Sequence, residues 1–410
     1  MKVMISHIPN TFNYGSAMMA INLIYYLNIK FNGNVEFYVD TRTEKDLENL
    51  RLSTGLNNIK VNSILPDKKK IISAKQDVNL DLNWIGEYCE GITNNYDSFI
   101  VLGGDDLSEY YSKEHVVYEL FKINRIGNEI PTFLVGQTIG PFTGWREKYA
   151  ADMLKSVYIF TREYLTFEYL KKDLEVQKVF VSSDLALEDL PGQGEYDTDY
   201  LFKRYNINKK QYVTLIPSGL TRVYTENFDY YLENWLGIIE YLINEKNCKV
   251  VLLPHVLRPK GSDDRIVIEN IVSRISNRYS EMLAYINNDI SPLDARQVLG
   301  NGIFSISGRM HGAVSTFQMR KPAISLSYSV KYKGVIGGGL GRNDLIVESV
   351  GDKKWEDQKI KREVIDKIEY LMTNYDGIVA EIGQYLEKRK LELDNMMDEI
   401  HRLIRELHHG

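Results

Sequence analysis

At 410 residues, the chain exceeds what one hydrophobic core usually organises, so we expect two domains. The formal net charge of −6 gives no global case for nucleic-acid binding. Cys89 and Cys248 match no metal or redox spacing, which is typical of buried thiols in a reducing cytoplasm. The amino terminus has no signal-peptide pattern, and no apolar run approaches the roughly 20 residues that span a bilayer. We therefore expect a soluble, cytoplasmic protein.

The first half of the chain alternates β-rich runs with helical sequence. The expected strands are residues 2–8, 35–40, 98–102, 132–135, 157–160 and 179–181, and residues 16–31 have a helical period. This alternation predicts a mainly parallel sheet covered by helices on both faces.

An acidic, glycine-rich stretch at 188–199 has the composition of an exposed domain linker. Alternation then resumes, with expected strands at 212–216, 250–253, 284–286, 303–306 and 322–328 and helices at 230–243, after Asp263 and at 313–319. The fold class is therefore α/β, with two Rossmann-like domains, 1–190 and 200–375, facing each other across a cleft.

Residues 376–410 are expected to form a long C-terminal helix. Leucine or isoleucine recurs every seven residues at Leu386, Leu393, Ile400 and Leu407, and Arg389 interrupts the stripe. The pattern favours packing of this helix along its own domain, and a coiled-coil homodimer is the alternative.

The most informative motif is the run from 303 to 312. A β-rich segment ends at Gly308, and Arg309 and His311 follow it at the start of an expected helix. This geometry places both side chains at the carboxyl edge of a parallel sheet, where α/β folds bind ligands. Arginine can grip a carboxylate or phosphate, and histidine transfers protons near neutral pH. The alternative is a surface arginine beside a buried structural histidine.

Two glycine-containing strand exits in the first domain have similar potential. Asn13, Gly15 and Ser16 form a turn into a helix, which suits an anion or is a plain helix cap. Gly103 and Gly104 leave room for a ligand at the next exit. There, Asp105 can accept hydrogen bonds from a hydroxyl-rich substrate, but the adjacent acids form no metal site by themselves.

Four further polar residues follow expected strands, and each has a structural alternative. Gln137 lies in a glycine-flanked exit, and Arg162 either binds a ligand or pairs with Glu163. His255 ends a strand of the second domain and is structural or functional. Lys331 follows the strand after the Arg309–His311 motif and either enters the cleft or stays in solvent.

Several familiar signatures do not occur. The chain has no G-x-x-x-x-G-K-[ST] phosphate loop, no G-x-S-x-G elbow and no H-E-x-x-H or paired-cysteine metal pattern. ATP hydrolysis, an α/β-hydrolase mechanism and a structural zinc are therefore disfavoured, and no metal ligands are assigned.

Taken in order, the motifs resemble those of the polysaccharide pyruvyl transferase family. The matching segments are Asn13-Tyr-Gly-Ser16, Leu102-Gly-Gly104, Gly136-Gln-Thr-Ile-Gly-Pro-Phe142, Thr161-Arg-Glu163, Ser183-Asp-Leu-Ala186 and Ser307-Gly-Arg-Met-His-Gly312, with Pro322 and Lys331 downstream. The family usually has aspartate in place of Ser16, a third glycine in place of Asp105 and leucine in place of Met310. Met310 is a conservative replacement, and the departures at Ser16 and Asp105 concern the identity of the acceptor more than the type of reaction.

The resemblance implies a GT-B-like arrangement and transfer of a pyruvyl group from phosphoenolpyruvate to a sugar, as a ketal on a cell-surface polysaccharide or its lipid-linked precursor. Domain 1–190 would then be the acceptor side and domain 200–375 the donor side. Arg309, Arg162 and Lys331 would bind the anionic donor, and His311 would be the general acid. Asp105 can receive a hydroxyl proton. No cofactor is required, because phosphoenolpyruvate is a co-substrate.

Two other function classes stay open at this stage. A GT-B glycosyltransferase would use the same arginine and histidine to bind the diphosphate of a nucleotide sugar. An inactive glycan-binding or assembly protein would bind neither donor. The expected partners are phosphoenolpyruvate and a glycan or lipid-linked sugar, with no nucleic acid and at most peripheral membrane contact.

Overall fold

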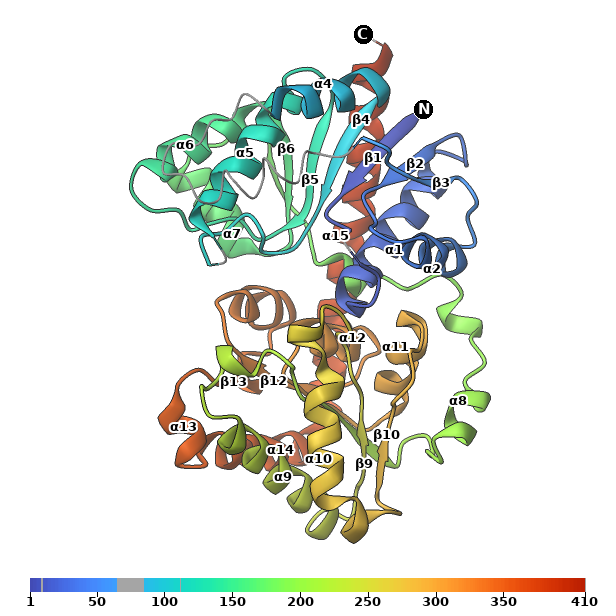
Figure 1. Cartoon of the computed structure of the whole chain (residues 1–410), viewed down its shortest axis with the longest axis vertical. Coiled ribbons are helices and arrows are strands. Elements are labelled where there is room, and N and C mark those ends of the chain that lie inside the picture. Colours follow the sequence, from blue (N-terminus) through green and yellow to red (C-terminus); the bar gives the residue numbers. More distant parts are fainter. Residues whose placement is uncertain (9, 65–84, 111, 410) are drawn as a thin grey trace. The chain divides into compact units, whose positions relative to one another are not determined.

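The computed structural model describes residues 1–8, 10–64, 85–110 and 112–409 (Figure 1). The chain divides into two compact units. Unit 1 contains Met1–Thr11, Met19–Leu185 and Arg389–Gly410, and unit 2 contains Phe12–Met18 and Ala186–Lys388. Each unit is thus assembled from more than one stretch of the chain.

Within the described residues, unit 1 is built on a seven-stranded sheet in the order β3-β2-β1-β4-β5-β6-β7. The strands are β1 (Lys2–Ser6), β2 (Glu36–Val39), β3 (Ile59–Val61), β4 (Ser98–Leu102), β5 (Thr132–Gln137), β6 (Tyr158–Thr161) and β7 (Val179–Val181). Every pair of neighbours is parallel, as the alternating sequence predicts. The strand order reverses between β1 and β4, which makes this pair the switch point of the sheet.

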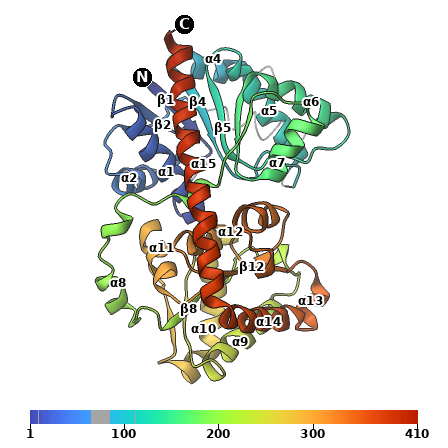
Figure 2. The ribbon, with the colours of Figure 1, turned by 180° about the vertical axis from the view of Figure 1, so that it is seen from behind.

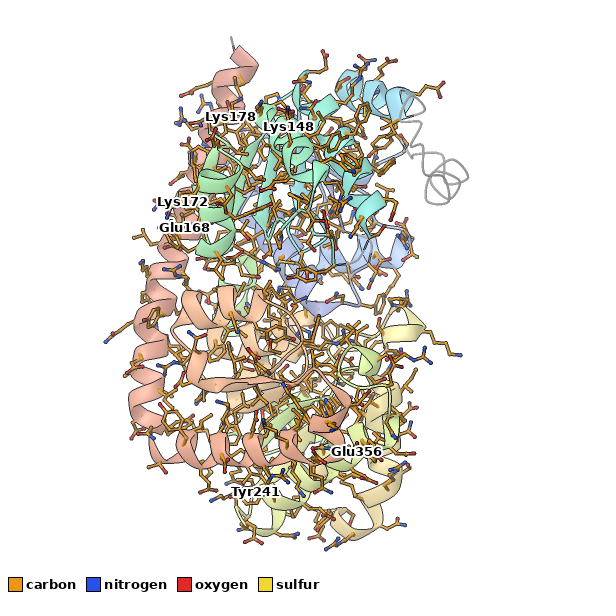
Figure 3. All side chains as sticks on the ribbon, turned by 90° about the vertical axis from the view of Figure 1, so that its left-hand side faces the viewer. Lys148, Glu168, Lys172, Lys178, Tyr241 and Glu356 are labelled. Atoms are coloured by element: carbon orange, nitrogen blue, oxygen red, sulfur yellow. The ribbon has the colours of Figure 1, made fainter. Side chains whose placement is uncertain are left out.

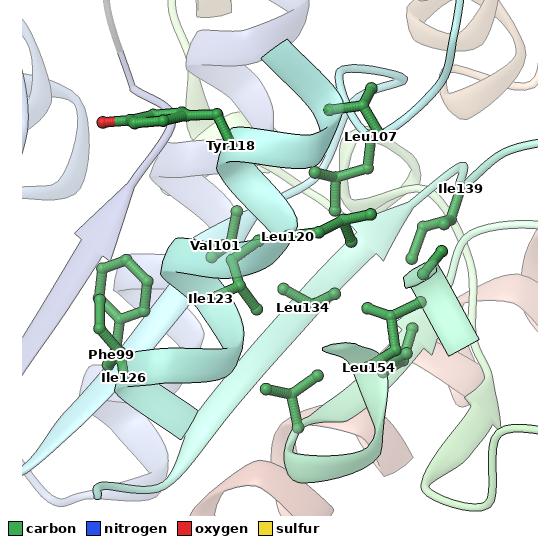
Figure 4. Close-up of a cluster of buried hydrophobic side chains, with 14 of the residues drawn as sticks. Phe99, Val101, Leu107, Tyr118, Leu120, Ile123, Ile126, Leu134, Ile139 and Leu154 are labelled. Carbon is green, nitrogen blue, oxygen red and sulfur yellow. The ribbon is translucent and has the colours of Figure 1, made fainter. Parts of the chain in front are cut away.

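The helices of unit 1 follow the strands in the expected alternation. They are α1 (Tyr14–Lys30, whose first turns belong to unit 2), α2 (Glu44–Thr54), α4 (Ile85–Asn95), α5 (Lys113–Gly127), α6 (Trp145–Met153) and α7 (Tyr164–Glu168). Figure 4 shows α5 lying over β4 and β5, with Leu120 and Ile123 against Val101 and Leu134. All four side chains are at most 1% exposed. Each such buried aliphatic side chain contributes about 1.5–3 kcal/mol.

Unit 2 contains, in the part of the chain that the structure describes, a six-stranded sheet in the order β10-β9-β8-β11-β12-β13. Its strands are β8 (Tyr212–Ile216), β9 (Lys249–Leu252), β10 (Leu283–Tyr285), β11 (Ser305–Ser307), β12 (Ala323–Ser327) and β13 (Ile346–Glu348). All of its pairs are parallel. The helices are α8 (Asp199–Arg204), α9 (Phe228–Asn244), α10 (Asp264–Tyr279), α11 (Pro292–Asn301), α12 (Met310–Gln318), α13 (Asp352–Glu356) and α14 (Lys359–Thr373).

The long C-terminal helix α15 spans Tyr375–His409 and is continuous (Figure 2). Leu386, Leu393 and Ile400 of its heptad stripe are at most 1% exposed, whereas Leu407 is half exposed. In unit 1, Asp394 accepts a hydrogen bond from Lys30 of α1 at 2.7 Å. The stripe is therefore largely covered by this chain itself. Among the described residues, no helix is long and apolar enough to cross a membrane.

The connection between the domains differs from the exposed linker predicted at 188–199. Leu190 is buried, and the carbonyl oxygen of Glu188 accepts a hydrogen bond from Nη1 of Arg296 at 2.8 Å. Gln193 is bonded to Gln318 at 3.0 Å. Arg296 is fully buried on α11 and needs acceptors, which this segment supplies. The prediction of an exposed linker is therefore wrong for its first half.

The unit boundaries also differ from the predicted ones: unit 2 resumes at Ala186, although the first domain was expected to reach residue 190, and two segments change sides. Phe12–Met18 belongs to unit 2, although the sequence places it in the first domain. The C-terminal helix is shared, with residues from Arg389 onward in unit 1 and its earlier turns in unit 2. Neither assignment has a local sequence signal, because both depend on which distant residues a helix contacts.

Candidate active site

The second sheet reverses its strand order between β8 and β11. Strands β9 and β10 extend the sheet on one side of this point, and β12 and β13 extend it on the other. In open α/β sheets, ligands bind outside the carboxyl ends of the strands at such a point. The segments that leave β8 and β11 here carry Gly219 and Arg309. Arg309 thus lies at the switch point of the sheet, where ligands commonly bind in folds of this type.

Arg309 is held by a buried carboxylate. Its Nε and Nη2 donate to Oδ1 of Asp264 at 3.0 and 2.7 Å, and Nη2 also donates to the carbonyl of Ser262 at 2.6 Å. Burial works to lower the pKa of Arg309, but the charge of Asp264 raises it above its ordinary value. The guanidinium edge formed by Nε and Nη2, which was predicted to bind a ligand anion, therefore faces Asp264. Nη1 is the guanidinium nitrogen outside this pairing.

Asp264 also joins the ends of two strands. Its Oδ1 accepts the backbone N–H of Gly219 at 2.7 Å, and its Oδ2 accepts those of His255 and Val256 at 3.0 and 2.9 Å. A fully buried carboxylate is tolerated only with such a set of donors. Sequence analysis gave Asp264 no role, because acidic residues are common for local reasons at the start of a helix.

His311 lies in the first turn of α12 and is partly exposed. The Gly15 backbone packs against its ring, since a Cβ at position 15 would lie 2.4 Å from Cγ and Nδ1 of His311. A larger residue at position 15 would therefore displace the imidazole. The close approach of His311 thus explains why glycine stands at position 15.

The rest of the turn before α1 packs beside the end of β9. Asn13 forms an antiparallel bridge with Val256, and the N–H of Tyr14 donates to the carbonyl of His255 at 3.1 Å. Ser16 follows in the same turn, with its N–H 3.5 Å from Oδ1 of Asn13. The first motif thus packs against both predicted histidines, through Gly15 at His311 and through Tyr14 at His255, all within unit 2.

His255 is a buried, neutral histidine. It is 1% exposed, its ring meets that of Tyr14 edge-on at 5.6 Å between centroids, and its Nε2 has no hydrogen-bond partner among the described residues. Burial lowers the pKa of His255 well below its ordinary value, and the neighbouring His311 and Arg309 lower it further. A buried polar atom without a partner is unusual and is often found at functional sites.

Lys331 lies beyond the end of β12, on the same edge of the second sheet. It is 8% exposed, and its Nζ donates to the hydroxyl of Tyr328 at 3.0 Å. On the same edge, the turn before Arg309 is fixed by Tyr224, whose hydroxyl donates to the carbonyl of Gly308 at 2.5 Å. Lys331 is thus buried and is not a solvated surface lysine.

Of the two adjacent glycines after β4, Gly103 has a packing explanation and Gly104 does not. A Cβ on Gly103 would lie 1.9 Å from the carbonyl oxygen of Gly136, so glycine is required for the approach of β4 to β5. A Cβ on Gly104 would lie 3.4 Å from the carboxylate of Asp106, which is ordinary contact distance. The carbonyl of the partly buried Asp105 accepts the hydroxyl of Ser108 at 2.7 Å. Room for a ligand is therefore not needed to explain Gly103.

Gln137 and Arg162 are buried and bonded within unit 1. Nε2 of Gln137 donates to the carbonyl of Leu102 at 3.1 Å. Nη1 of Arg162 lies 3.1 Å from the carboxylate of Asp184, and its Nε donates to Thr138 at 2.8 Å. Asp184, rather than the adjacent Glu163, is the carboxylate partner of Arg162. Ligand contacts by Gln137 and Arg162 stay predictions.

Sequence analysis missed a charged cluster at the end of β1. Nε2 of His7 lies 3.2 Å from Glu119 and Nδ1 lies 3.5 Å from Asp106, while Lys122 lies 2.5 Å from Glu119. Burial works to lower the pKa of His7, but Asp106 and Glu119 raise it to about 10. His7 also has a φ of 70°, which is uncommon for a residue with a side chain. A histidine at the end of a strand was the only sequence signal.

The predicted site residues thus fall into two groups. Asn13, Gly15, Ser16, His255, Arg309, His311 and Lys331 belong to unit 2, and Gly103, Gly104, Asp105, Gln137 and Arg162 belong to unit 1. Among the residues that the structure describes, no group of three or more histidine, cysteine, aspartate or glutamate side chains could hold a metal ion.

A family model described as polysaccharide pyruvyl transferase matches residues 13–330. The chain belongs to this family. The match runs from the turn before α1 to the residue before Lys331, and so includes Arg309, His311 and Asp264. The family resemblance predicted from the ordered motifs is therefore confirmed, and membership supports a polysaccharide-modifying transferase.

Among curated proteins, this family member is similar to the amylovoran biosynthesis protein AmsJ of Erwinia amylovora. The two are 21% identical over 326 residues, which cover 75% of this chain and 74% of AmsJ.

Solved structures confirm the GT-B-like fold. A protein described as a putative UDP-N-acetylglucosamine 2-epimerase, from Listeria monocytogenes, has a TM-score of 0.61 at 12% identity, and the match covers 93% of this chain and 90% of that protein. TcCGT1 in complex with UDP also has a TM-score of 0.61, at 10% identity and 99% coverage of both chains. At such low identity, the likeness concerns the fold alone.

Proposed function

We propose that this protein transfers a pyruvyl group from phosphoenolpyruvate to a sugar of a cell-surface polysaccharide or of its lipid-linked precursor. The observation that carries the proposal is the start of α12, where Asp264 orients Arg309 and Gly15 packs against His311. These residues gather a fixed cation and a proton-transfer group at the switch point of one sheet. The family supports the reaction class.

The donor carries a carboxylate and a phosphate, so its site needs several fixed donors. Nη1 of Arg309, the ammonium of Lys331 and the first-turn amides of α12 are the groups suited to this role. Asp264 cancels part of the positive charge but fixes the guanidinium before the donor arrives, which lowers the entropy lost on binding. This arrangement favours a small, multiply charged anion.

The proposed reaction uses His311 as the acid. His311 gives a proton to the methylene carbon of the donor, and positive charge develops on the adjacent carbon. A sugar hydroxyl attacks that carbon, and the carbon–oxygen bond to phosphate breaks with its electron pair on the phosphate oxygen. A second hydroxyl of the same sugar closes the ketal, and the two hydroxyl protons leave to His311 and to phosphate. General acid catalysis of this kind contributes about 10²–10⁴-fold.

A thermal-shift screen with phosphoenolpyruvate and with uridine and guanosine diphosphate sugars tests the donor. At a donor concentration one hundred times its Kd, binding stabilises the folded state by about 2.7 kcal/mol. Phosphoenolpyruvate should therefore raise the unfolding temperature by several degrees. A saturable shift with only a nucleotide sugar would instead make the protein a glycosyltransferase. No shift with either donor class would favour a glycan-binding or assembly role.

A further inference from the structure

The segments that follow three neighbouring strands of unit 1, including the starts of α6 and α7, expose large apolar side chains. Tyr110 follows β4, Trp145 follows β5, and Tyr164 and Leu165 follow β6, and these four are between 54% and 61% exposed. Because β4, β5 and β6 are adjacent and parallel, their carboxyl ends share one edge of the sheet. We call these four residues the aromatic platform. Clustered exposed apolar side chains commonly mark interaction sites.

The first two loops are locked together by one carboxylate. Glu109 accepts from Nε and Nη2 of Arg146 at 2.6 and 3.2 Å, and from the N–H and hydroxyl of Thr143 at 2.8 Å each. Burial works to raise the pKa of Glu109, but Arg146 and Thr143 lower it to about 2. Tyr110 and Trp145, the neighbours of this pair in sequence, are therefore presented on a fixed backbone.

The third loop is tied to the second by Tyr169. Its hydroxyl accepts the backbone N–H of Phe142 at 3.0 Å. A Cβ on Gly140 would lie 2.6 Å from the ring of Tyr169, so the ring lies directly on this backbone. The helical turns that begin with Tyr164 are thus anchored to the loop that carries Trp145. A preorganised surface of this kind loses little entropy when it binds a partner.

The charges around the platform are balanced. The guanidinium of Arg146 lies 5.7 Å from the Trp145 ring centroid but is paired with Glu109. Lys172, labelled beside Glu168 in Figure 3, forms an ion pair with it at 2.6 Å. An anionic membrane or a nucleic acid would need a local excess of cations, whereas the exposed Lys148 follows the exposed Glu147 and the exposed Lys113 precedes the exposed Glu114. A neutral partner needs no such excess.

We propose that the aromatic platform binds the glycan chain of the acceptor, through stacking of its rings on the apolar faces of neutral hexoses. Asp106, on the same loop as Tyr110, has a half-exposed side chain and offers carboxylate oxygens to sugar hydroxyls. Aromatic side chains with a few polar groups are the usual lining of sites for such ligands. This inference rests on the proposed function in one respect, namely that the bound glycan is the acceptor of the pyruvyl group.

The test is titration with neutral oligosaccharides of three to six hexoses, with Trp145→Ala, Tyr164→Ala and a conservative Trp145→Phe variant. Leu391→Ala is the matched control, because Leu391 is 61% exposed and lies on α15 in the same unit. We expect the two alanine variants to bind oligosaccharide at least tenfold more weakly, and the Phe variant and the control to bind as the wild type does. Titration with phosphoenolpyruvate should give the same affinity for every variant.

Three results would overturn the platform proposal. They are no oligosaccharide binding by the wild type, binding that both alanine variants retain, and binding of phosphatidylglycerol vesicles in place of oligosaccharide. Failure of the proposed function looks different, because the wild type would then bind oligosaccharide through Trp145 and Tyr164 without binding phosphoenolpyruvate.

Discussion

Arg309 directs two nitrogens at one oxygen of Asp264, at 3.0 and 2.7 Å. We predict that Asp264→Asn weakens both the fold and donor binding. An amide offers one acceptor oxygen where the carboxylate serves five donated hydrogen bonds, and its NH₂ group would oppose other donors. Removing one charge of a buried pair costs about 3–5 kcal/mol. Chemical denaturation and phosphoenolpyruvate titration measure the two effects, and unchanged values for both would remove Asp264 from the site.

Gly15→Ala should lower turnover without unfolding the protein. The new methyl group would lie 2.4 Å from the ring of His311, so the imidazole must move away from the donor. Gly194→Ala is the control, because a Cβ there has no atom within 4 Å. We expect a loss of about tenfold or more in phosphate release from phosphoenolpyruvate with a glycan acceptor. Equal turnover in the two variants would show that the position of His311 is not critical.

His255→Leu separates a functional role from a structural one. Leucine removes a buried nitrogen that has no hydrogen-bond partner among the described residues, so the unfolding temperature should not fall by more than a few degrees. Turnover should fall at least tenfold if the neutral imidazole serves the reaction beside His311. A variant with full turnover would make His255 a packing residue.

His7 should make the stability of the protein sensitive to alkaline pH. Its pKa is raised from 6.5 to about 10 in the folded state, so the stabilisation is complete below pH 6.5 and is lost as the pH rises through 10. Thermal unfolding between pH 7 and pH 10.5 should show a steeper decline for the wild type than for His7→Gln. Parallel declines would mean that His7 is not charged at neutral pH.

The sequence predicts most of the fold because the long β-rich runs are local signals. The predicted strands 98–102 and 212–216 match β4 and β8. Strands β3 and β13 were not predicted, because each has three residues at a sheet edge, and so short a run carries little periodicity. The bounds of the other predicted strands shift by at most two residues, as at β9, and the helix expected at 313–319 begins three residues earlier, at Met310.

The contacts of the site were much harder to predict. Arg309 and His311 could be chosen from a strand, a glycine and a helix that are consecutive in the chain. Asp264 lies 45 residues from Arg309 in the sequence, and nothing in either segment indicates the other. The packing of Gly15 against His311 likewise depends on the tertiary fold alone. Local patterns therefore predict which residues are reactive, and the fold determines which partners orient them.

Isothermal titration of the wild-type protein and of Arg309→Lys tests the central claim most directly, with phosphoenolpyruvate and a uridine diphosphate sugar as separate ligands. Lysine keeps the charge but loses Nη1 and the paired geometry with Asp264. The account predicts saturable binding of phosphoenolpyruvate by the wild type, roughly tenfold weaker binding by the variant, which is about 1.4 kcal/mol, and no saturable binding of the nucleotide sugar. Saturable binding of only the nucleotide sugar would contradict it.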